Sequence, residues 1–404
     1  MAKKKRTTKY WIGQIHLWLG LASGLVVLIV SITGCLYVFQ KEISEAVYKD
    51  KYFVTPSSAP VLPASVLLHN AQAALGPEMP INTMIACKRP DRSVECMAYR
   101  SNDSAATYFG AFVYFKSVFV NPYTGAVLGV RDYRSDFFNV VKFIHWSLLL
   151  NTKYGQPIVG ISTLVFVLLL ISGLVLWWPK KWNRAAIKKS FTINWKASFK
   201  RVNYDSHNVP GFYTLIPALI ISLTGLVFAF EWFEGLVYVA ASGSTTPPAQ
   251  VVVESKLSKI DSTSKPLDLA VNEAWKSMPS SKRLIMSPAA GEKGTIWIGG
   301  YKDDETYFGS DVMQFDQYTG RLLHRRNDSE KNRGEKLIER NYDIHVGAIA
   351  GIPGKILAFL ASLICASLPV TGFLIWWGRR NKKKPARLHK AAQTVVSKAE
   401  VAEA

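Results

Sequence analysis

Four of the seven histidines in this 404-residue chain stand at the edges of long apolar stretches. They are His16, His145, His207 and His345. An imidazole in such a place can cap a helix end, carry protons through a membrane or ligate a metal ion. No cysteine or carboxylate partner accompanies them at metal-ligand spacing, which argues against a site for a bare metal ion. The remaining histidines are expected to be ordinary surface or packing residues: His69, His324 and His389.

The apolar residues are concentrated in four stretches of 22 or 23 residues that contain no charged side chain. A helix needs about 20 apolar residues to cross the hydrocarbon core of a bilayer, so each stretch predicts one membrane span. The stretches are 17–39, 157–178, 209–230 and 356–377. The sequence therefore predicts an integral membrane protein, a four-helix bundle in a lipid bilayer.

The net charge of +20 comes mostly from the two tails and from the segment between the second and third apolar stretches. These three segments hold 21 Lys and Arg residues against three acidic ones. An even number of spans puts them on one side of the membrane, and the positive-inside rule makes that side the cytoplasm. Both termini are thus expected in the cytoplasm and two lobes in the periplasm. We expect no nucleic-acid partner.

The chain contains the same series of residues twice, which indicates an internal duplication. A histidine is followed by glycine after four and after eighteen residues in both halves: His16, Gly20 and Gly34, then His207, Gly211 and Gly225. Two further sequences recur in order: Thr-Tyr-Phe-Gly at 107–110 and 306–309, and Tyr-Thr-Gly at 123–125 and 318–320. His145 and His345 are each followed by Gly-X-Pro, by Ser-Gly or Thr-Gly, and by Trp-Trp. Each half is therefore helix, lobe, helix, and the halves are parallel repeats about a pseudo-twofold axis along the membrane normal.

This topology determines which histidines can meet. His16 and His207 begin helices that leave the cytoplasm, so both lie near the inner membrane face. His145 and His345 precede helices that return from the periplasm, so both lie near the outer face. Two imidazoles on opposite sides of the axis are what a six-coordinate haem iron accepts. The sequence predicts two haem groups, and the absence of the covalent attachment motif CxxCH makes them haem b.

Four glycines fall where a flat ring would need space between helices. Eighteen residues make five full helical turns, so the glycine eighteen positions after His16 or His207 shares that histidine's face at the far end of the helix. These glycines are expected beside the outer haem, and those of the later Ser-Gly and Thr-Gly sequences beside the inner haem. In that order they are Gly34 and Gly225, then Gly173 and Gly372. Small residues also simply let membrane helices pack closely, and that alternative stays open.

Two aspartates lie two residues before a predicted ligand. Asp205 precedes His207, and Asp343 precedes His345. Each could hydrogen-bond the imidazole and tune the iron, or could cap a helix instead.

Each lobe is predicted to be α+β. Helical spacing of apolar residues is found at 64–75 and 267–275, and alternation typical of strands follows at 295–300 and 312–315. Cys87 and Cys96 flank a predicted hairpin turn. The oxidising periplasm would favour a disulfide between them.

The chain resembles the PepSY-associated transmembrane family over nearly its whole length, up to about residue 380. The resemblance rests on these sequences: His16 with Thr33-Gly34, Ile144-His145 with Ser172-Gly173 and Trp177-Trp178, Tyr204-Asp205-Ser206-His207 with Thr224-Gly225, and Asp343-Ile-His345 with Thr371-Gly372 and Trp376-Trp377. It implies that the lobes are PepSY modules and that the four histidines ligate two b haems. It also implies electron transfer to a ferric siderophore in the periplasm of a Gram-negative bacterium. The electron donor stays open between a quinol and a cytoplasmic flavoprotein.

The predicted function is therefore an inner-membrane ferric-siderophore or ferric-chelate reductase whose substrate docks between the two lobes, over the outer haem. Reduction releases iron because common siderophores bind ferric iron far more tightly than ferrous iron, and no catalytic side chain is required. One alternative is a siderophore or metal-chelate permease, but the sequence shows no broken central helix and no evident pore. Another is a membrane-anchored regulator that binds a protein through its PepSY lobes.

The predicted organisation, in chain order, is a basic tail with the first span at 1–40, the first lobe at 41–140, the second span with its histidine segment at 141–179, a basic cytoplasmic loop at 180–206, the third span at 207–233, the second lobe at 234–340, the fourth span at 341–380 and a disordered basic tail at 381–404.

Overall fold

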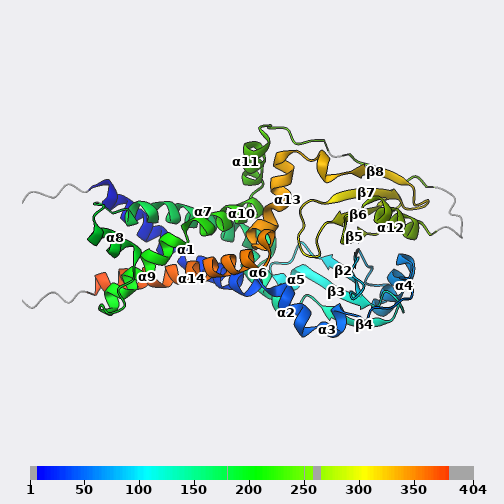
Figure 1. Cartoon of the computed structure of the whole chain (residues 1–404), viewed down its shortest axis with the longest axis horizontal. Coiled ribbons are helices and arrows are strands. Elements are labelled where there is room, and N and C mark those ends of the chain that lie inside the picture. The colour runs from blue at the N-terminus through cyan, green and yellow to red at the C-terminus, as the bar shows by residue number, and fades with distance from the viewer. Residues whose placement is uncertain (1–6, 180, 250, 258–264, 382–404) are drawn as a thin grey trace, which may run out of the picture.

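The computed structural model describes residues 7–179, 181–249, 251–257 and 265–381. It has a bundle of long apolar helices at one end and a β-sheet with its own helices at the other (Figure 1). Helix α1 (Thr8–Tyr37) begins, and α14 (Gly351–Arg380) ends, at the end of the bundle that lies away from the sheet (Figure 1). Most of both basic tails, including His389, lies outside the described residues.

Within the described part of the chain, three helices are long and apolar enough to cross a membrane: α1, α7 (Thr152–Trp177) and α14. The fourth apolar stretch is a bent pair, α9 (Phe199–Tyr213) and α10 (Leu215–Ala229), with an angle of 68° at the break. Pro217 explains the break. It has no backbone N–H to donate to the Tyr213 carbonyl, and in a continuous helix its ring would clash with that carbonyl. The expectation that no central helix is broken is therefore wrong.

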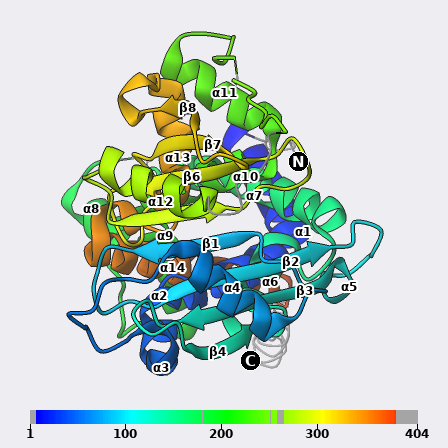
Figure 2. The ribbon, with the colours of Figure 1, turned by 90° about the vertical axis from the view of Figure 1, so that its right-hand side faces the viewer.

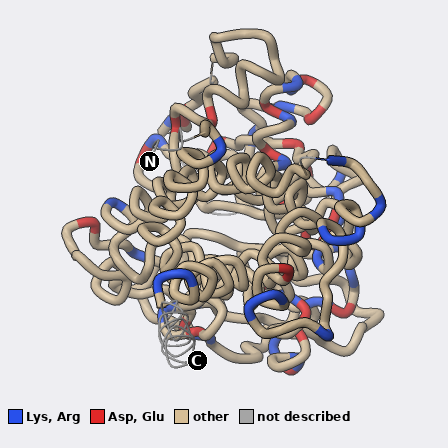
Figure 3. The backbone as a smooth tube through the Cα atoms, turned by 90° about the vertical axis from the view of Figure 1, so that its left-hand side faces the viewer, with Lys and Arg blue, Asp and Glu red and all other residues tan. Residues whose placement is uncertain are grey.

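The surface of this bundle is apolar. Figure 3 looks along it from the end where α1 begins and α14 ends, and Lys, Arg, Asp and Glu are found mainly at the rim, in loops and lobes rather than around the axis. Large apolar side chains on the outer faces of the helices are at least half exposed: Leu25, Ile161, Ile216 and Leu357. Contact with lipid accounts for such a surface, which water would not favour.

The strands of both lobes join into one antiparallel sheet, in the order β4-β3-β2-β1-β5-β6-β7-β8. Their bounds are β1 (Thr83–Cys87), β2 (Val94–Ser101), β3 (Phe112–Val120), β4 (Val127–Asp132), β5 (Arg283–Ser287), β6 (Thr295–Tyr301), β7 (Asp311–Asp316) and β8 (Leu322–Arg326). Strand β1 of one lobe pairs with β5 of the other, and Ile85 lies opposite Ile285. The lobes are thus continuous at this edge. The predicted substrate site between the two lobes, over the outer haem, stays a prediction.

Helices α4 (Ala64–Leu75) and α12 (Pro266–Ser277) cover the sheet face that points away from the bundle (Figure 2). Their small and apolar residues pack against alternate residues of the central strands, which form the main core of the lobes. Leu67 and Ala270 are examples from the helices, and Met84 and Leu284 from the strands. The predicted helices and the predicted strands at 295–300 and 312–315 are confirmed.

The predicted hairpin between β1 and β2 is present, but the disulfide is wrong. Cys96 lies opposite Met84 and is buried in the core. Cys87 lies three positions after Met84 on β1, and an odd offset turns its side chain to the other face of the sheet. All four cysteines are free.

Short helices connect the spans, the lobes and the sheet: α2 (Gln40–Val47), α3 (Lys49–Tyr52), α5 (Tyr108–Ala111), α6 (Phe137–Ser147), α8 (Arg184–Phe191), α11 (Glu231–Ser242), the 3-10 turn η1 (Asp328–Glu330), α13 (Arg333–His345) and the 3-10 turn η2 (Ala348–Ala350). Helices α6 and α13 matter most for the site, because each precedes a long apolar helix and carries one of the four histidines near its end.

Candidate functional site

Helices α6 and α13 are the elements that position His145 and His345, which we call the sheet-proximal pair. Helix α6 begins at Asp136, whose carboxylate accepts hydrogen bonds from two backbone N–H groups of the first turn. Helix α13 begins with a capping box between Asn332 and Glu335. Such caps satisfy N–H groups that have no partner within the helix, and so define where each helix starts.

A tight elbow then fixes each of these helices against the long helix that follows. A Cβ atom on Gly155 would lie 1.9 Å from the carbonyl oxygen of Ser147, and one on Gly354 would lie 2.1 Å from that of Gly347. Only glycine permits such close approach of two backbone segments. The structural counterpart of Gly155 is therefore Gly354, and not Gly351 as the Gly-X-Pro match suggested.

The sheet-proximal pair meets between the two halves of the chain. The ring centroids of His145 and His345 are 6.0 Å apart, and their planes are inclined at 69°. Both rings line a cavity of about 300 Å³ with a mostly apolar wall, to which α1, α7, α10 and α14 also contribute.

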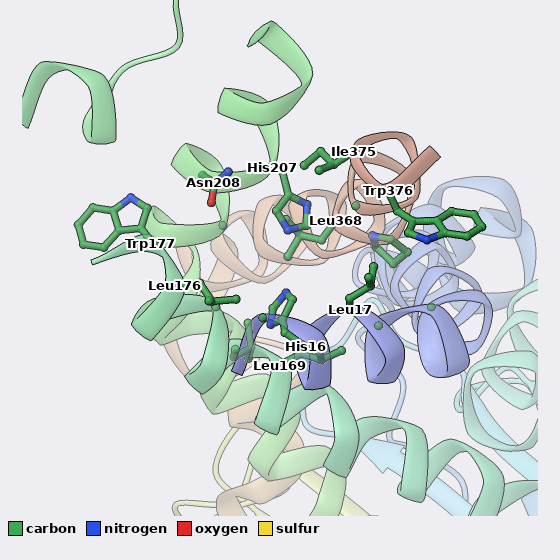
Figure 4. A pocket seen from close by; sticks show the side chains of 18 of the residues that line it. His16, Leu17, Leu169, Leu176, Trp177, His207, Asn208, Leu368, Ile375 and Trp376 are labelled. Carbon is green, nitrogen blue, oxygen red and sulfur yellow. The ribbon is translucent and has the colours of Figure 1, made fainter. Parts of the chain in front are cut away.

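The sheet-distal pair, His16 and His207, lines a second cavity of about 470 Å³. Figure 4 shows the two imidazoles on opposite walls, His16 on α1 and His207 on α9, pointing toward one another. The bend between α9 and α10 leaves Gly211 and Leu215 in the wall of this cavity. The structure thus brings together the two histidine couples that the topology predicted.

Hydrogen bonds determine which ring nitrogen of the sheet-proximal histidines carries the proton. Nδ1 of His145 lies 2.8 Å from the carbonyl oxygen of Val30, and Nδ1 of His345 lies 3.1 Å from that of Ile221. A carbonyl can only accept, so in both rings Nδ1 is the donor. The neutral ring then leaves its Nε2 lone pair free to bind a metal.

The sheet-distal histidines reach the same tautomer through hydroxyl groups. His16 Nδ1 lies 2.8 Å from Ser172 Oγ, and His207 Nδ1 lies 2.9 Å from Thr371 Oγ1. Each hydroxyl already donates its single proton to the carbonyl four residues earlier, Leu168 or Ser367. It must therefore accept from the imidazole, and Nε2 is again free.

The same type of residue stands beside the sheet-proximal rings. Thr33 Oγ1 is 3.2 Å from His145 Nδ1, and Thr224 Oγ1 is 2.9 Å from His345 Nδ1. All four rings therefore contact a Ser-Gly or Thr-Gly sequence. These dipeptides were recognised in the sequence as marks of the repeat, but the role of their hydroxyl groups was not predicted. Its signal was the Ser or Thr before each of the four glycines.

The four glycines lie against the imidazoles themselves. A Cβ atom added to each would lie 3.3–3.5 Å from the Cε1 atom of one histidine. The couples are Gly34 with His145, Gly225 with His345, Gly173 with His16, and Gly372 with His207. Each glycine thus makes room for the ring that the preceding hydroxyl orients.

The two aspartates do not act on the histidines. Asp205 is ion-paired with Arg201, and Asp343 accepts hydrogen bonds from the backbone N–H groups of Tyr307 and Phe308. The predicted bonds to imidazole are therefore wrong. Burial raises the pKa of the Asp343 carboxyl although both N–H groups oppose this shift. Its role is to fasten a loop of the second lobe to α13.

The chemistry of the site is that of paired neutral imidazoles in apolar cavities. Among the described residues, no three His, Cys, Asp or Glu side chains gather as they would around a bare metal ion. Of the other histidines, His69 is exposed on α4 and His324 lies partly buried on β8, far in sequence from either pair. Each pair can offer two ligands from opposite sides, to a centre that brings its remaining ligands with it.

Long apolar helices that enclose two such cavities, with a sheet at one end, define a membrane protein with histidine pairs between its halves. The family model described as the PepSY-associated TM region matches residues 14–379, and the chain belongs to this family. No curated protein matches the chain.

Proposed function

We propose that this protein is a b-type di-haem electron-transfer protein of a bacterial inner membrane that reduces a ferric chelate, such as a ferric siderophore. In this proposal the bent pair α9 and α10 is the fourth span, both termini are cytoplasmic and the sheet is periplasmic. The observation that carries it is the tautomer of the four histidines, which all turn a free Nε2 toward a cavity shared by both halves.

The residues fit the proposed cofactor. Two imidazoles that share one metal ion, at about 2 Å per bond, have ring centroids about 6 Å apart. The sheet-proximal rings are 6.0 Å apart. Both cavities have the size and apolar lining of small-molecule sites. When bound, haem supplies one-electron chemistry, since its iron cycles between the ferric and ferrous states.

The chain's own part is to hold, orient and shield. The hydroxyl and carbonyl acceptors hold each Nδ1–H, which fixes the ring and raises the basicity of Nε2. The apolar walls exclude water. Eighteen residues separate His16 from Gly34 on α1, which places the two pairs about 27 Å apart along the bundle. Two sites at this spacing would link the two membrane surfaces for electrons from a quinol or a cytoplasmic flavoprotein.

The product side requires one electron for each ferric ion. A chelate that favours ferric iron loses most of its affinity once that electron arrives, so ferrous iron is released without any bond of the chelator being broken. For this reason the proposal assigns no acid, base or nucleophile. The acceptor is expected on the sheet side, next to the His145–His345 pair.

Haem quantification tests the cofactor. Protein purified after expression with ample haem should carry two b haems per chain, and His16→Ala or His145→Ala should each lower this to one. A wild-type protein without an absorption band of reduced haem b would refute the proposal. Reduced protein in proteoliposomes should then be oxidised by a ferric siderophore, and a gallium chelate of the same shape, which accepts no electron here, is the control.

One observation favours a second candidate, a chelate permease. Broken central helices are typical of transporters, and the break between α9 and α10 borders the sheet-distal cavity. Uptake of a labelled gallium chelate into proteoliposomes by haem-free protein would support the permease. Its absence, together with oxidation of the haems by the ferric chelate, would leave the reductase.

A further inference from the structure

Lys142 stands out among the residues that line the sheet-proximal cavity. The wall consists of apolar side chains with a few hydroxyl, amide and imidazole groups, and Lys142 is its one Lys, Arg, Asp or Glu among the described residues. It lies three residues before His145 on α6. Tyr342 occupies the corresponding place before His345 and also lines the cavity. The position therefore faces the cavity in both halves, and only one half places a cation there.

This ammonium group forms no ion pair in the described structure, and Asp136 is the one acidic group whose charge acts on it. Asp136, at the start of the same helix, is ion-paired with Arg131 instead. Nζ of Lys142 lies 5.0 Å from the centroid of the Phe143 ring. A cation held at an apolar wall without an ion-pair partner is costly, so an occupant that carries negative charge would gain from it.

The other cavity shows the same arrangement at the opposite end of the bundle. Lys9 and Arg379 line the sheet-distal cavity, near the start of α1 and the end of α14. No acidic residue lines either cavity in the described chain. Each cavity is thus apolar in its middle and cationic toward one membrane surface, which suits a flat apolar ligand with acidic groups on one edge.

We propose that Lys142 binds a propionate carboxylate of the haem held by His145 and His345, so that the acidic edge of this haem faces the sheet. This inference rests on the proposed function, because it names the group that orients that same cofactor. An ammonium ion beside the carboxylate also offsets negative charge near the iron. The ferric form carries one more positive charge than the ferrous form, so removal of the ammonium favours the ferric form and lowers the midpoint potential.

The test isolates one site at a time. A chain with His16→Ala and His207→Ala should keep only the sheet-proximal haem, and one with His145→Ala and His345→Ala only the sheet-distal haem. Lys142→Met is placed in each background, with Lys142→Arg as the variant that keeps the charge. Lys153→Met serves as a matched control, because Lys153 lies at the start of α7 and does not line the cavity. Haem content and midpoint potential are measured by spectroelectrochemical titration.

We expect Lys142→Met to lower the potential of the sheet-proximal haem, or to lose that haem, with recovery in Lys142→Arg. The sheet-distal haem and the Lys153→Met control should be unchanged. If Lys142→Met leaves the content and the midpoint potential of the sheet-proximal haem unchanged, the assignment is overturned, and Lys142 interacts with lipid headgroups or water instead. The assignment is also overturned if Lys142→Met and Lys142→Arg lose this haem to the same extent. If the parent chain binds no haem at all, the proposed function fails instead.

Discussion

Removal of a single hydroxyl group should weaken one cofactor site and leave the other intact. Ser172 Oγ, 2.8 Å away, is the one hydrogen-bond partner that the described structure gives to Nδ1 of His16. In Ser172→Ala this N–H has no acceptor. A buried donor without a partner costs about 1–3 kcal/mol. Loss of such a support for a metal-bound histidine lowers affinity about 10- to 100-fold.

The sheet-proximal site offers a matched comparison, because its histidines have a second acceptor. Nδ1 of His145 is 3.2 Å from Thr33 Oγ1 but only 2.8 Å from the Val30 carbonyl oxygen. Thr33→Val removes the hydroxyl and keeps the shape of the side chain. The backbone carbonyl then still accepts the proton, so we expect less than a threefold change in haem affinity, under about 1 kcal/mol.

The assay is haem titration of the apo-protein, with the histidine pair of the other site replaced by alanine. Ser172→Ala is measured in the chain with His145→Ala and His345→Ala, and Thr33→Val in the chain with His16→Ala and His207→Ala. Equal losses in the two backgrounds would refute the reasoning, because they would show that the backbone carbonyl does not hold the ring. Full retention of affinity in Ser172→Ala would show that the hydroxyl is not needed.

Three further predictions concern the glycines and the lobes. Gly34→Leu should abolish the sheet-proximal haem but spare the sheet-distal one in a haem count, because even a Cβ atom would lie 3.4 Å from His145 Cε1 and a larger side chain would displace the ring, at a cost of about 1–3 kcal/mol. Buried Lys355 is ion-paired with both Glu42 and Glu305. Lys355→Met leaves these carboxylates unpaired and should destabilise the chain by about 3 kcal/mol, measured as a lower thermal midpoint. Adding Glu42→Gln to this variant should partly restore the thermal midpoint. Burial alone would raise the pKa of Asp316, but hydrogen bonds from the backbone N–H groups of Lys256, Thr319 and Tyr318 outweigh it and lower this pKa. The stability that Asp316 contributes should therefore be present above its ordinary pKa and be lost as pH falls through the lowered value. Asp316→Asn should remove this part of the acid dependence of the thermal midpoint. An unchanged acid dependence in this variant would contradict the assignment.

Individual helices and turns could be predicted because the residue pattern that specifies each one lies within its own segment. The helix at Ala64–Leu75 follows from the spacing of its apolar residues, and the turns at Gly125 and Gly320 are both left-handed, with φ of 72° and 70°. The joining of the two lobes could not be predicted in this way. Strand β1 has the composition of any central strand, and nothing in its five residues indicates that its second neighbour is β5, nearly two hundred residues later.

The break in the third span had a signal that was not used. Pro217 is present in the sequence, but proline is common in membrane helices, and composition alone does not distinguish a kink from a break. The arithmetic of five turns from His207 to Gly225 assumed a straight helix. Gly225 nevertheless lies next to His345. This is because Gly225 lies on α10, and α10 is positioned by packing against α7 and α13 and not by the direction of α9.

The contacts of the four histidines show which helix orients each ring, which the predicted topology did not indicate. In the first half, α7 orients His16 of α1, while α1 orients His145 of α6. In the second half, α14 orients His207 of α9, while α10 orients His345 of α13. Every imidazole is therefore positioned within its own half, and each cavity lies between one ring of either half. Each half thus holds two imidazoles in place on its own, and a group bound by both rings of a cavity would join the halves at that level. Cofactor binding should then stabilise the contact between α1 and α14 and between α7 and α10, which are the most extensive helix contacts between the two halves.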